Sequence, residues 1–345
     1  MDVNDGVRVK DAENCLLCDK TGTVLYQGLR DRLFSAPGIW NYLRCPDCSL
    51  VWLHPHPVLE DINKLYGDYY THNAQGSSLP LASMRRKLEH AVLGTRFGYG
   101  KYLANSPREK IIGELVSLIS PLRDIAGART MWLEAGGGGH LLDIGCGNGE
   151  FLAFMRELGW EVVGVEPDPE AAQIAQSKFG LEVIYSDLRE VGLPKEFFTA
   201  ITMSHVIEHM VDPMEVLYTC HQLLKPNGRL IVVTPNVESL GHQVFGAAWR
   251  GLEPPRHLFL FSKSTLSDCL SYAGFEIQTI RATAARGFGI WLRSRLIKEN
   301  RIQANKVRSP YSYILKDLAF WISELLLAGI KPQIGEEIVA IGVKR

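Results

Sequence analysis

The chain has 345 residues, of which 46% are hydrophobic, and its formal net charge is −1. That length and apolar content suffice for one catalytic domain of ordinary size with a smaller appendage. The near-neutral charge does not favour nucleic acid as a partner of the whole molecule. No signal-peptide core opens the chain and no apolar run reaches membrane-spanning length, so we expect a cytoplasmic protein.

Two CxxC pairs stand near the N-terminus. Their members are Cys15, Cys18, Cys45 and Cys48. Four thiolates in two such pairs suit a tetrahedral zinc ion with no open position, and the ion would let a small segment fold without a large core. We therefore predict a structural zinc ribbon over residues 10–72. The alternative is free or redox-active thiols, and His54 or His56 could replace one thiolate.

The next stretch reads as a helical linker over residues 73–110. It opens with the turn-rich sequence HNAQGSSLP, which fits a domain boundary. A basic, periodic segment predicts a helix over 84–103, and a second helix is expected over 111–122, ended by Pro121. The four glycines of EAGGGGHLL are expected to form a surface turn without a ligand.

The sequence LLDIGCGNGEFL, residues 141–152, predicts a strand, a glycine-rich turn and a helix. Glycines such as Gly145 and Gly147 accept positive φ and let the backbone approach a ligand over the helix N-terminus. The next strand, EVVGVEP, ends in Glu166 about 20 residues on, where a doubly wound fold presents a carboxylate to a ribose. The turn reads GxGxG followed by Glu150, which does not favour a dehydrogenase with GxGxxG.

Three further motifs follow in order. They are YSDL (185–188), MSHVIEHMVDP (203–213) and LLKPNGRLIVVTPN (223–236). With the two preceding motifs they resemble the class I S-adenosylmethionine-dependent methyltransferases across about residues 113–280. The resemblance implies an α/β fold, a Rossmann-like seven-stranded sheet over 111–345 with an antiparallel last strand, and insertions at 236–262 and 285–330. The zinc-ribbon lead-in resembles that of some bacterial sugar and polysaccharide methyltransferases.

The resemblance also places residues around S-adenosylmethionine. They are Asp143, Gly145, Cys146, Gly147, Glu166, Pro167, Asp187, Leu188, Ser204 and His205. Glu166 is expected to accept hydrogen bonds from both ribose hydroxyls. Asp187 is expected to face the adenine amino group with Leu188 beside the ring, although Asp187 could instead cap a helix.

Candidate catalytic residues follow the fourth strand. His205, Glu208 and His209 share one face if they begin a helix, which invites a metal site. We prefer a general base at His205 or His209, because the spacing is shorter than in HExxH metal sites and a hydroxyl nucleophile must lose a proton. Capping or packing is the alternative for either histidine.

The insertion at 236–262 holds residue types that line pockets. Trp249, Arg250 and Arg256 are candidate substrate contacts, with an arginine holding an anionic group. His257 is a second candidate base, or else a structural hydrogen-bond donor in the PPRH turn.

A basic stretch over 281–308 precedes an apolar helix over 315–330. Basic side chains near the pocket would suit a diphosphate-bearing acceptor, and the helix could rest on a membrane surface. The plainer alternative is a solvated helix followed by a core or dimer helix.

The expected reaction is methyl transfer to a hydroxyl of a small molecule, ahead of nitrogen or carbon. The resemblance favours a sugar, a nucleotide sugar or a lipid-linked glycan, in polysaccharide biosynthesis. An RNA methyltransferase that recognises RNA through the zinc ribbon is the alternative, although MSHVIEH replaces the NPPY-type motif used for base nitrogens. A cofactor-binding scaffold without an acceptor site is a third reading, which the complete set of cofactor motifs opposes.

Overall fold

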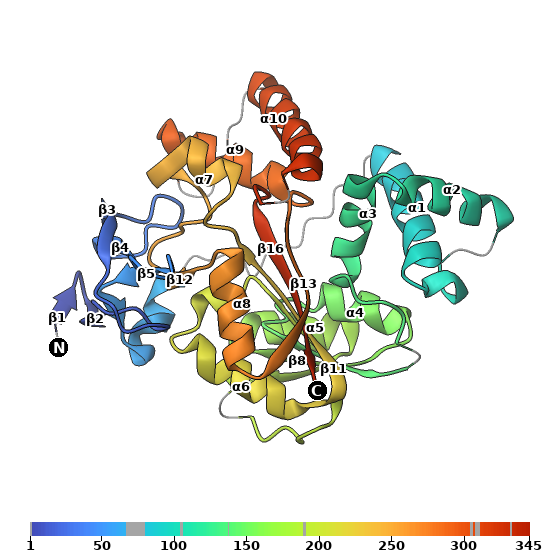
Figure 1. Cartoon of the computed structure of the whole chain (residues 1–345), viewed down its shortest axis with the longest axis horizontal. Helices are drawn as coiled ribbons and strands as arrows, with labels where there is room; N and C mark the ends of the chain where they lie inside the picture. The colour runs from blue at the N-terminus through green and yellow to red at the C-terminus, as the bar shows by residue number, and fades with distance from the viewer. Residues whose placement is uncertain are drawn as a thin grey trace.

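The structure is a computed structural model that describes residues 2–66, 80–103, 106–136, 138–188, 191–303, 306–307, 311–331 and 333–345. Its centre is a seven-stranded sheet in the order β13-β16-β11-β10-β7-β8-β9 (Figure 1). The strands are β7 (His140–Ile144), β8 (Glu161–Glu166), β9 (Glu182–Tyr185), β10 (Phe198–Ser204), β11 (Leu224–Pro235), β13 (Phe275–Thr283) and β16 (Glu337–Lys344). Only β16 runs antiparallel to its neighbours in this sheet. The expected Rossmann-like methyltransferase sheet is confirmed.

Both faces of this sheet are covered, because successive strand residues point to opposite sides. Leu142 and Leu230 pack with α6 and α8, whereas Leu141 and Ile231 pack with α4 and α5. These helices are α4 (Glu150–Glu157), α5 (Pro169–Phe179), α6 (Pro213–Leu223) and α8 (Lys263–Tyr272). Strands buried on both faces explain the near-continuous apolar runs in the sequence.

The N-terminal module consists of two small sheets. One contains β1 (Asp2–Asn4), β2 (Val7–Lys10) and β6 (His56–Pro57); the other contains β3 (Thr23–Leu29), β4 (Trp40–Arg44), β5 (Val51–His54) and β12 (Phe259–Leu260). A 3-10 helix, η1 (Leu59–Leu65), follows β6. β12 belongs to the insertion after β11 and pairs with β5 of the N-terminal module. The second sheet therefore contains strands from both sides of the predicted domain boundary. The boundaries at 72 and 110 stay predictions. Residues 67–79, which include HNAQGSSLP up to Leu79, lie outside the described residues.

The segment before the sheet is helical. Its elements are α1 (Pro80–Arg96), η3 (Tyr99–Lys101), α2 (Pro107–Ser117), α3 (Ser120–Gly127) and η4 (Ala128–Thr130). The helix expected over 84–103 ends at Arg96, and Gly98 then takes a left-handed φ of 80° before η3. The helix expected over 111–122 is divided between α2 and α3. The prediction that Pro121 ends a helix was wrong: it lies in the first turn of α3, where its fixed φ and missing N–H are tolerated.

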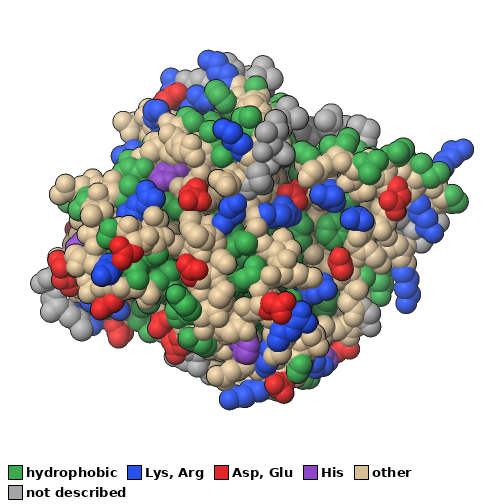
Figure 2. Space-filling view, viewed as in Figure 1, with side chains coloured by type: hydrophobic (Ala, Val, Ile, Leu, Met, Phe, Trp, Pro, Cys, Tyr) green, Lys and Arg blue, Asp and Glu red, His purple; other side chains and the backbone are tan. Residues whose placement is uncertain are grey.

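Apolar side chains stand exposed on α2 and at its junction with α3. They are Ile111, Ile112, Leu115, Leu118 and Ile119. Figure 2 shows apolar side chains over this helical projection, while positive and negative side chains are scattered over the rest of the visible face. No single-sign stripe dominates that face.

The remaining elements follow β10, lie in the insertion, or lie between β13 and β16 in the chain. They are η6 (Ile207–His209), α7 (Leu240–Phe245), η7 (Gly246–Ala248), α9 (Gly287–Lys298), β14 (Ile302–Gln303), β15 (Lys306–Val307) and α10 (Tyr311–Ile330). On α10, Glu324 is buried and accepts a hydrogen bond from Trp291 Nε1 of α9 at 2.8 Å. Among the described residues, none of the helices is long and apolar enough to cross a membrane.

Candidate functional site

The carboxyl ends of four adjacent parallel strands, β9, β8, β7 and β10, meet at one edge of the sheet. Strand pairing aligns Glu166 with Tyr185 and Ile144 with Met203. The structure therefore brings the glycine turn after β7, Glu166, Asp187 and Ser204 to the same edge. Open α/β sheets bind ligands at this edge, which explains why the predicted cofactor residues are far apart in the sequence but close in space.

The glycine turn leaves space for a ligand. Gly145 and Gly147 have left-handed φ values of 70° and 53°. A Cβ at Gly145 would lie 2.5 Å from Val206 Cγ2, so a side chain there would collide with the chain that follows β10. A Cβ at Gly147 would meet no heavy atom within 4 Å. The turn is therefore packed against Val206 at Gly145 and has open space beside Gly147.

Glu166 is held beside that open space. Its two carboxylate oxygens accept hydrogen bonds from the Gly147 N–H at 2.7 Å and the Asp168 N–H at 3.0 Å. Burial raises the pKa of Glu166, and these backbone hydrogen bonds oppose the rise. A carboxylate with two backbone donors retains lone pairs for further hydroxyl donors. The residues present therefore fit a ribose-bearing cofactor.

Asp143 has a structural anchor at the same edge. It is buried, and its Oδ1 accepts a hydrogen bond from Thr202 Oγ1 of β10 at 2.6 Å. Burial raises its pKa to about 7, against the effect of that hydrogen bond. Of the other predicted cofactor residues, Cys146 and Leu188 are buried, Asp187 is half-buried, and Pro167 is exposed.

His205 occupies the end of β10 in a conformation that the sequence did not indicate. Its φ is 56°, and the following turn is the 3-10 helix η6 rather than the start of an α-helix. Its Nε2 donates to Glu337 Oε1 at 2.7 Å, and its Nδ1 lies 3.2 Å from Glu208 Oε1. Burial alone lowers the pKa of His205, but the bonds and charges of the two carboxylates raise it to about 9.

Glu337 is the functional-site residue that our sequence analysis missed. It begins β16, and because β16 is antiparallel, its first residue lies at the carboxyl edge of the parallel strands. The sequence carried a usable signal, since an acidic pair precedes the apolar strand IVAIGV. Arg286 also reaches this edge, where its guanidinium donates to Ser204 Oγ at 3.0 Å and to the Ala128 carbonyl at 3.1 Å.

Two of the three predicted substrate contacts are enclosed. Trp249 is 1% exposed, donates Nε1 to Glu336 Oε2 at 2.8 Å and stacks on His242. Arg256 is also 1% exposed, and its guanidinium bonds Asp31 at 2.9 Å and Glu253 at 3.0 Å. The Trp249 Nε1–H and the Arg256 Nε and Nη1 groups bond other residues of the protein. Arg256 instead joins the insertion to the N-terminal module.

The other two insertion candidates also have partners within the protein. Arg250 is partly buried and pairs with Glu253. His257 is 4% exposed, and its Nδ1–H donates to the Gly251 carbonyl at 2.7 Å. Burial lowers the pKa of His257 to about 3. His209 is half-buried and lies against His257, with ring centroids 4.7 Å apart.

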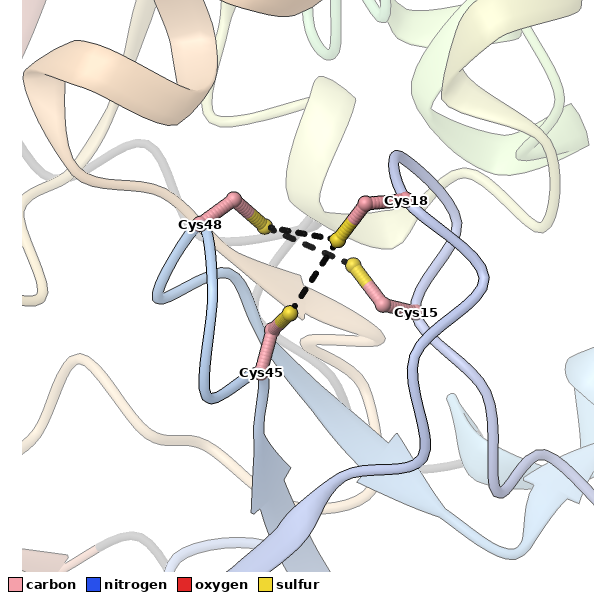
Figure 3. A group of neighbouring side chains, drawn as sticks. All are labelled: Cys15, Cys18, Cys45 and Cys48. Carbon is pink, nitrogen blue, oxygen red and sulfur yellow. Dashed lines mark hydrogen bonds between the residues drawn. The ribbon is translucent and has the colours of Figure 1, made fainter.

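The four predicted zinc ligands converge from two loops (Figure 3). Their Sγ atoms are separated by 3.5 Å for Cys15 and Cys48, 3.2 Å for Cys18 and Cys45, and 3.7 Å for Cys18 and Cys48. A tetrahedral zinc with bonds of about 2.3 Å requires sulfur separations of about 3.8 Å. The arrangement fits a structural zinc ion held by four thiolates, and the described residues that could share a metal here are these cysteines, without His54 or His56.

Comparisons with known proteins agree on the type of domain. A sequence profile described as a methyltransferase domain matches residues 110–280. The ubiquinone biosynthesis O-methyltransferase of Pseudomonas aeruginosa strain LESB58 is 31% identical over 179 residues, which are 48% of this chain and 77% of that protein. The enzyme of that name from Cereibacter sphaeroides strain ATCC 17029 is 35% identical over 147 residues, 39% of this chain and 60% of that protein.

Solved structures share lower identity with the chain. An S-adenosylmethionine-dependent methyltransferase from Mesorhizobium loti is 17% identical with a TM-score of 0.45, covering 64% of this chain and 97% of that one. Another from Archaeoglobus fulgidus is 23% identical with a TM-score of 0.42, covering 69% and 97%.

Proposed function

The chain belongs to the S-adenosylmethionine-dependent methyltransferases, and on that premise we propose that it methylates a hydroxyl oxygen of a small molecule. The observation that carries the proposal is the position of His205. It stands at the carboxyl end of β10, next to the strand that leads into the glycine turn, and Glu337 fixes its ring at 2.7 Å. The relatives named as O-methyltransferases support oxygen as the acceptor atom.

The cofactor half of the proposal assigns roles to three residues. Glu166 would accept hydrogen bonds from the ribose hydroxyls, and Gly147 would leave room for the cofactor backbone. Asp187, at the end of β9, would face the adenine amino group. When bound, the cofactor supplies an electrophilic methyl group on sulfur. The protein's task is then to align the acceptor oxygen with that methyl group and exclude competing nucleophiles.

On the acceptor side, we assign His205 the hydrogen bond to the acceptor oxygen. Its two carboxylate contacts hold the ring in one orientation, and an arriving hydroxyl would bond the ring at Nδ1 by replacing the longer contact with Glu208. His257 is left out of this role because its ring is buried and its Nδ1–H is already bonded to a carbonyl. His209 is left out because its ring packs against His257 and its Nδ1–H is bonded to the Arg256 carbonyl.

The test is transfer of a labelled methyl group into four classes of acceptor: phenols, nucleotide sugars, polyprenyl-linked glycans and total RNA. We expect label in one small-molecule class as a methyl ether. Phenols are tested because the relatives are named for ubiquinone biosynthesis, and sugars because of the resemblance of the zinc-ribbon lead-in. The polyprenyl-linked glycans also test whether the acceptor bears a diphosphate. They test as well whether the helix over 315–330 contacts a membrane surface.

The matched variants are His205→Ala and His221→Ala. His221 lies on α6 and packs against Phe275, away from the cofactor edge. We expect His205→Ala to retain cofactor binding, measured by calorimetry, and to lose about a hundredfold in rate, the size of effect that misplacing a reacting group produces. Label in RNA alone, or a His205→Ala rate equal to that of His221→Ala, would contradict the proposal.

A further inference from the structure

A second group of possible metal ligands lies next to His205, which contacts one of its members, and is separate from the cysteine site. It consists of Glu208, His209 and His257, and one ligand atom from each lies within 4.8 Å of the other two. Glu208 and His209 come from η6, while His257 comes from the turn before β12. Two segments that are distant in the sequence therefore present two imidazoles and a carboxylate to one point.

Hydrogen bonds orient both imidazoles for coordination. The Nδ1–H of His209 donates to the Arg256 carbonyl at 3.0 Å, and that of His257 donates to the Gly251 carbonyl at 2.7 Å. A carbonyl oxygen only accepts, so each neutral ring carries its lone pair on Nε2. Histidines that bind metals usually hold their other ring N–H in such a bond, which fixes the tautomer and the ring direction.

The carboxylate supplies an independent observation. Glu208 is fully buried, and its Oε2 accepts a hydrogen bond from Thr234 Oγ1 at 2.9 Å. Its Oε1 lies 3.2 Å from His205 Nδ1 in an ion pair, so the His205 ring balances part of the carboxylate's charge. A buried carboxylate is stabilised by the cations beside it, and an ion held by the two imidazoles would add one.

We propose that Glu208, His209 and His257 bind a divalent transition-metal ion of the zinc type. Two neutral imidazoles and one carboxylate are a ligand set that zinc accepts, with one position left for water. Bonds of about 2.1 Å would place tetrahedral ligand atoms about 3.4 Å apart, so the three side chains approach one another on binding. Glu253 Oε2 lies 3.5 Å from His257 Nε2, and Arg250 and Arg256 pair with the same carboxylate.

The position of the site gives the ion a structural role. Coordination would connect η6, at the end of β10, to the turn that leads into β12 and hence to the N-terminal sheet. Tyr66 of the N-terminal module also contacts this group, through its hydroxyl 3.0 Å from His209 Nδ1. The ion would thus fix the acceptor side of the catalytic domain against the cysteine-bearing module.

The first experiment needs no variant. The chain, saturated with Zn²⁺ and freed of excess by gel filtration, is titrated with an organic mercurial, which displaces zinc from thiolates, and released zinc is measured with a chromogenic chelator. We expect two zinc ions per chain, of which one is released by the mercurial and the other only by a strong chelator. Release of all the zinc by the mercurial, or one ion per chain in total, would overturn the proposal.

Variants then locate the second ion. His257→Ala should reduce the zinc content from two ions to one and leave the mercurial-sensitive ion in place. His242→Ala is the matched control, because His242 is also a histidine of the insertion with low exposure and with a backbone-bonded Nδ1, but lies outside the cluster. It should keep two ions. Cobalt loading of the wild-type chain provides a check that does not depend on the variant's folding, since a nitrogen–oxygen site lacks the sulfur-to-metal charge-transfer absorption of the cysteine site.

Discussion

The interaction most open to a decisive test is the buried contact of Arg256 with Asp31 and Glu253. The Arg256 and Asp31 side chains are 0% and 2% exposed, and Glu253 is 1% exposed. Arg256 Nη1 also donates to the Leu65 carbonyl at 3.1 Å. Arg256→Ala would therefore leave the Asp31 carboxylate and the Leu65 carbonyl buried without that cation, whereas Glu253 would keep only its ion pair with Arg250.

The expected cost follows from that burial. Removing one partner of a buried ion pair costs about 3–5 kcal/mol, because the remaining charge stays desolvated. We expect a loss of that size in the free energy of unfolding, measured by urea denaturation followed by circular dichroism at a fixed zinc concentration. Arg256→Lys should recover only part of it, since a single ammonium cannot reproduce the planar, branched contacts of a guanidinium.

The control is the exposed pair of Arg345 with Glu276, whose side chains are 65% and 57% exposed. Arg345→Ala should leave the urea curve nearly unchanged, because solvent screens exposed ion pairs. The reasoning would be refuted if Arg256→Ala matched the wild type in stability and instead raised the KM for the acceptor. That result would restore Arg256 to the substrate-binding role expected from the sequence.

Three further predictions concern the cofactor turn, a buried acid and the cysteine site. Gly147→Ala should weaken cofactor binding at least about tenfold by calorimetry, equivalent to about 1.4 kcal/mol, whereas Gly180→Ala, at a similar φ and with equally open surroundings, should not. Burial, with Glu336 nearby, raises the pKa of Glu324 to about 9, so stability should fall as pH rises from 4.5 to about 9. Glu324→Gln should flatten that dependence in urea melts, and an unchanged slope would contradict it. Cys45→Ser should remove one zinc ion, measured by mass spectrometry, and lower the melting temperature; a full zinc content would exclude the tetrathiolate site.

Features set by neighbouring residues could be predicted from the sequence. The glycine turn, Asp143 and Glu166 were predictable because a strand end followed by glycines has few alternative conformations, and parallel strands deliver their carboxyl ends to one edge. The cysteine pairs were predictable because CxxC spacing brings two sulfurs of one loop together. Each of these inferences needs only local geometry and the strand order that the motifs imply.

Contacts between distant segments were decided by the tertiary structure. His205 and Glu337 are separated by 132 positions, and Arg256 and Asp31 by 225. Residue type suggested pocket-lining roles for Trp249 and Arg256, but the pairing of β12 with β5 buries the insertion against the N-terminal module and gives both side chains internal partners. A sequence states which charges are present, whereas only the packed chain decides which of them are desolvated together and therefore must pair.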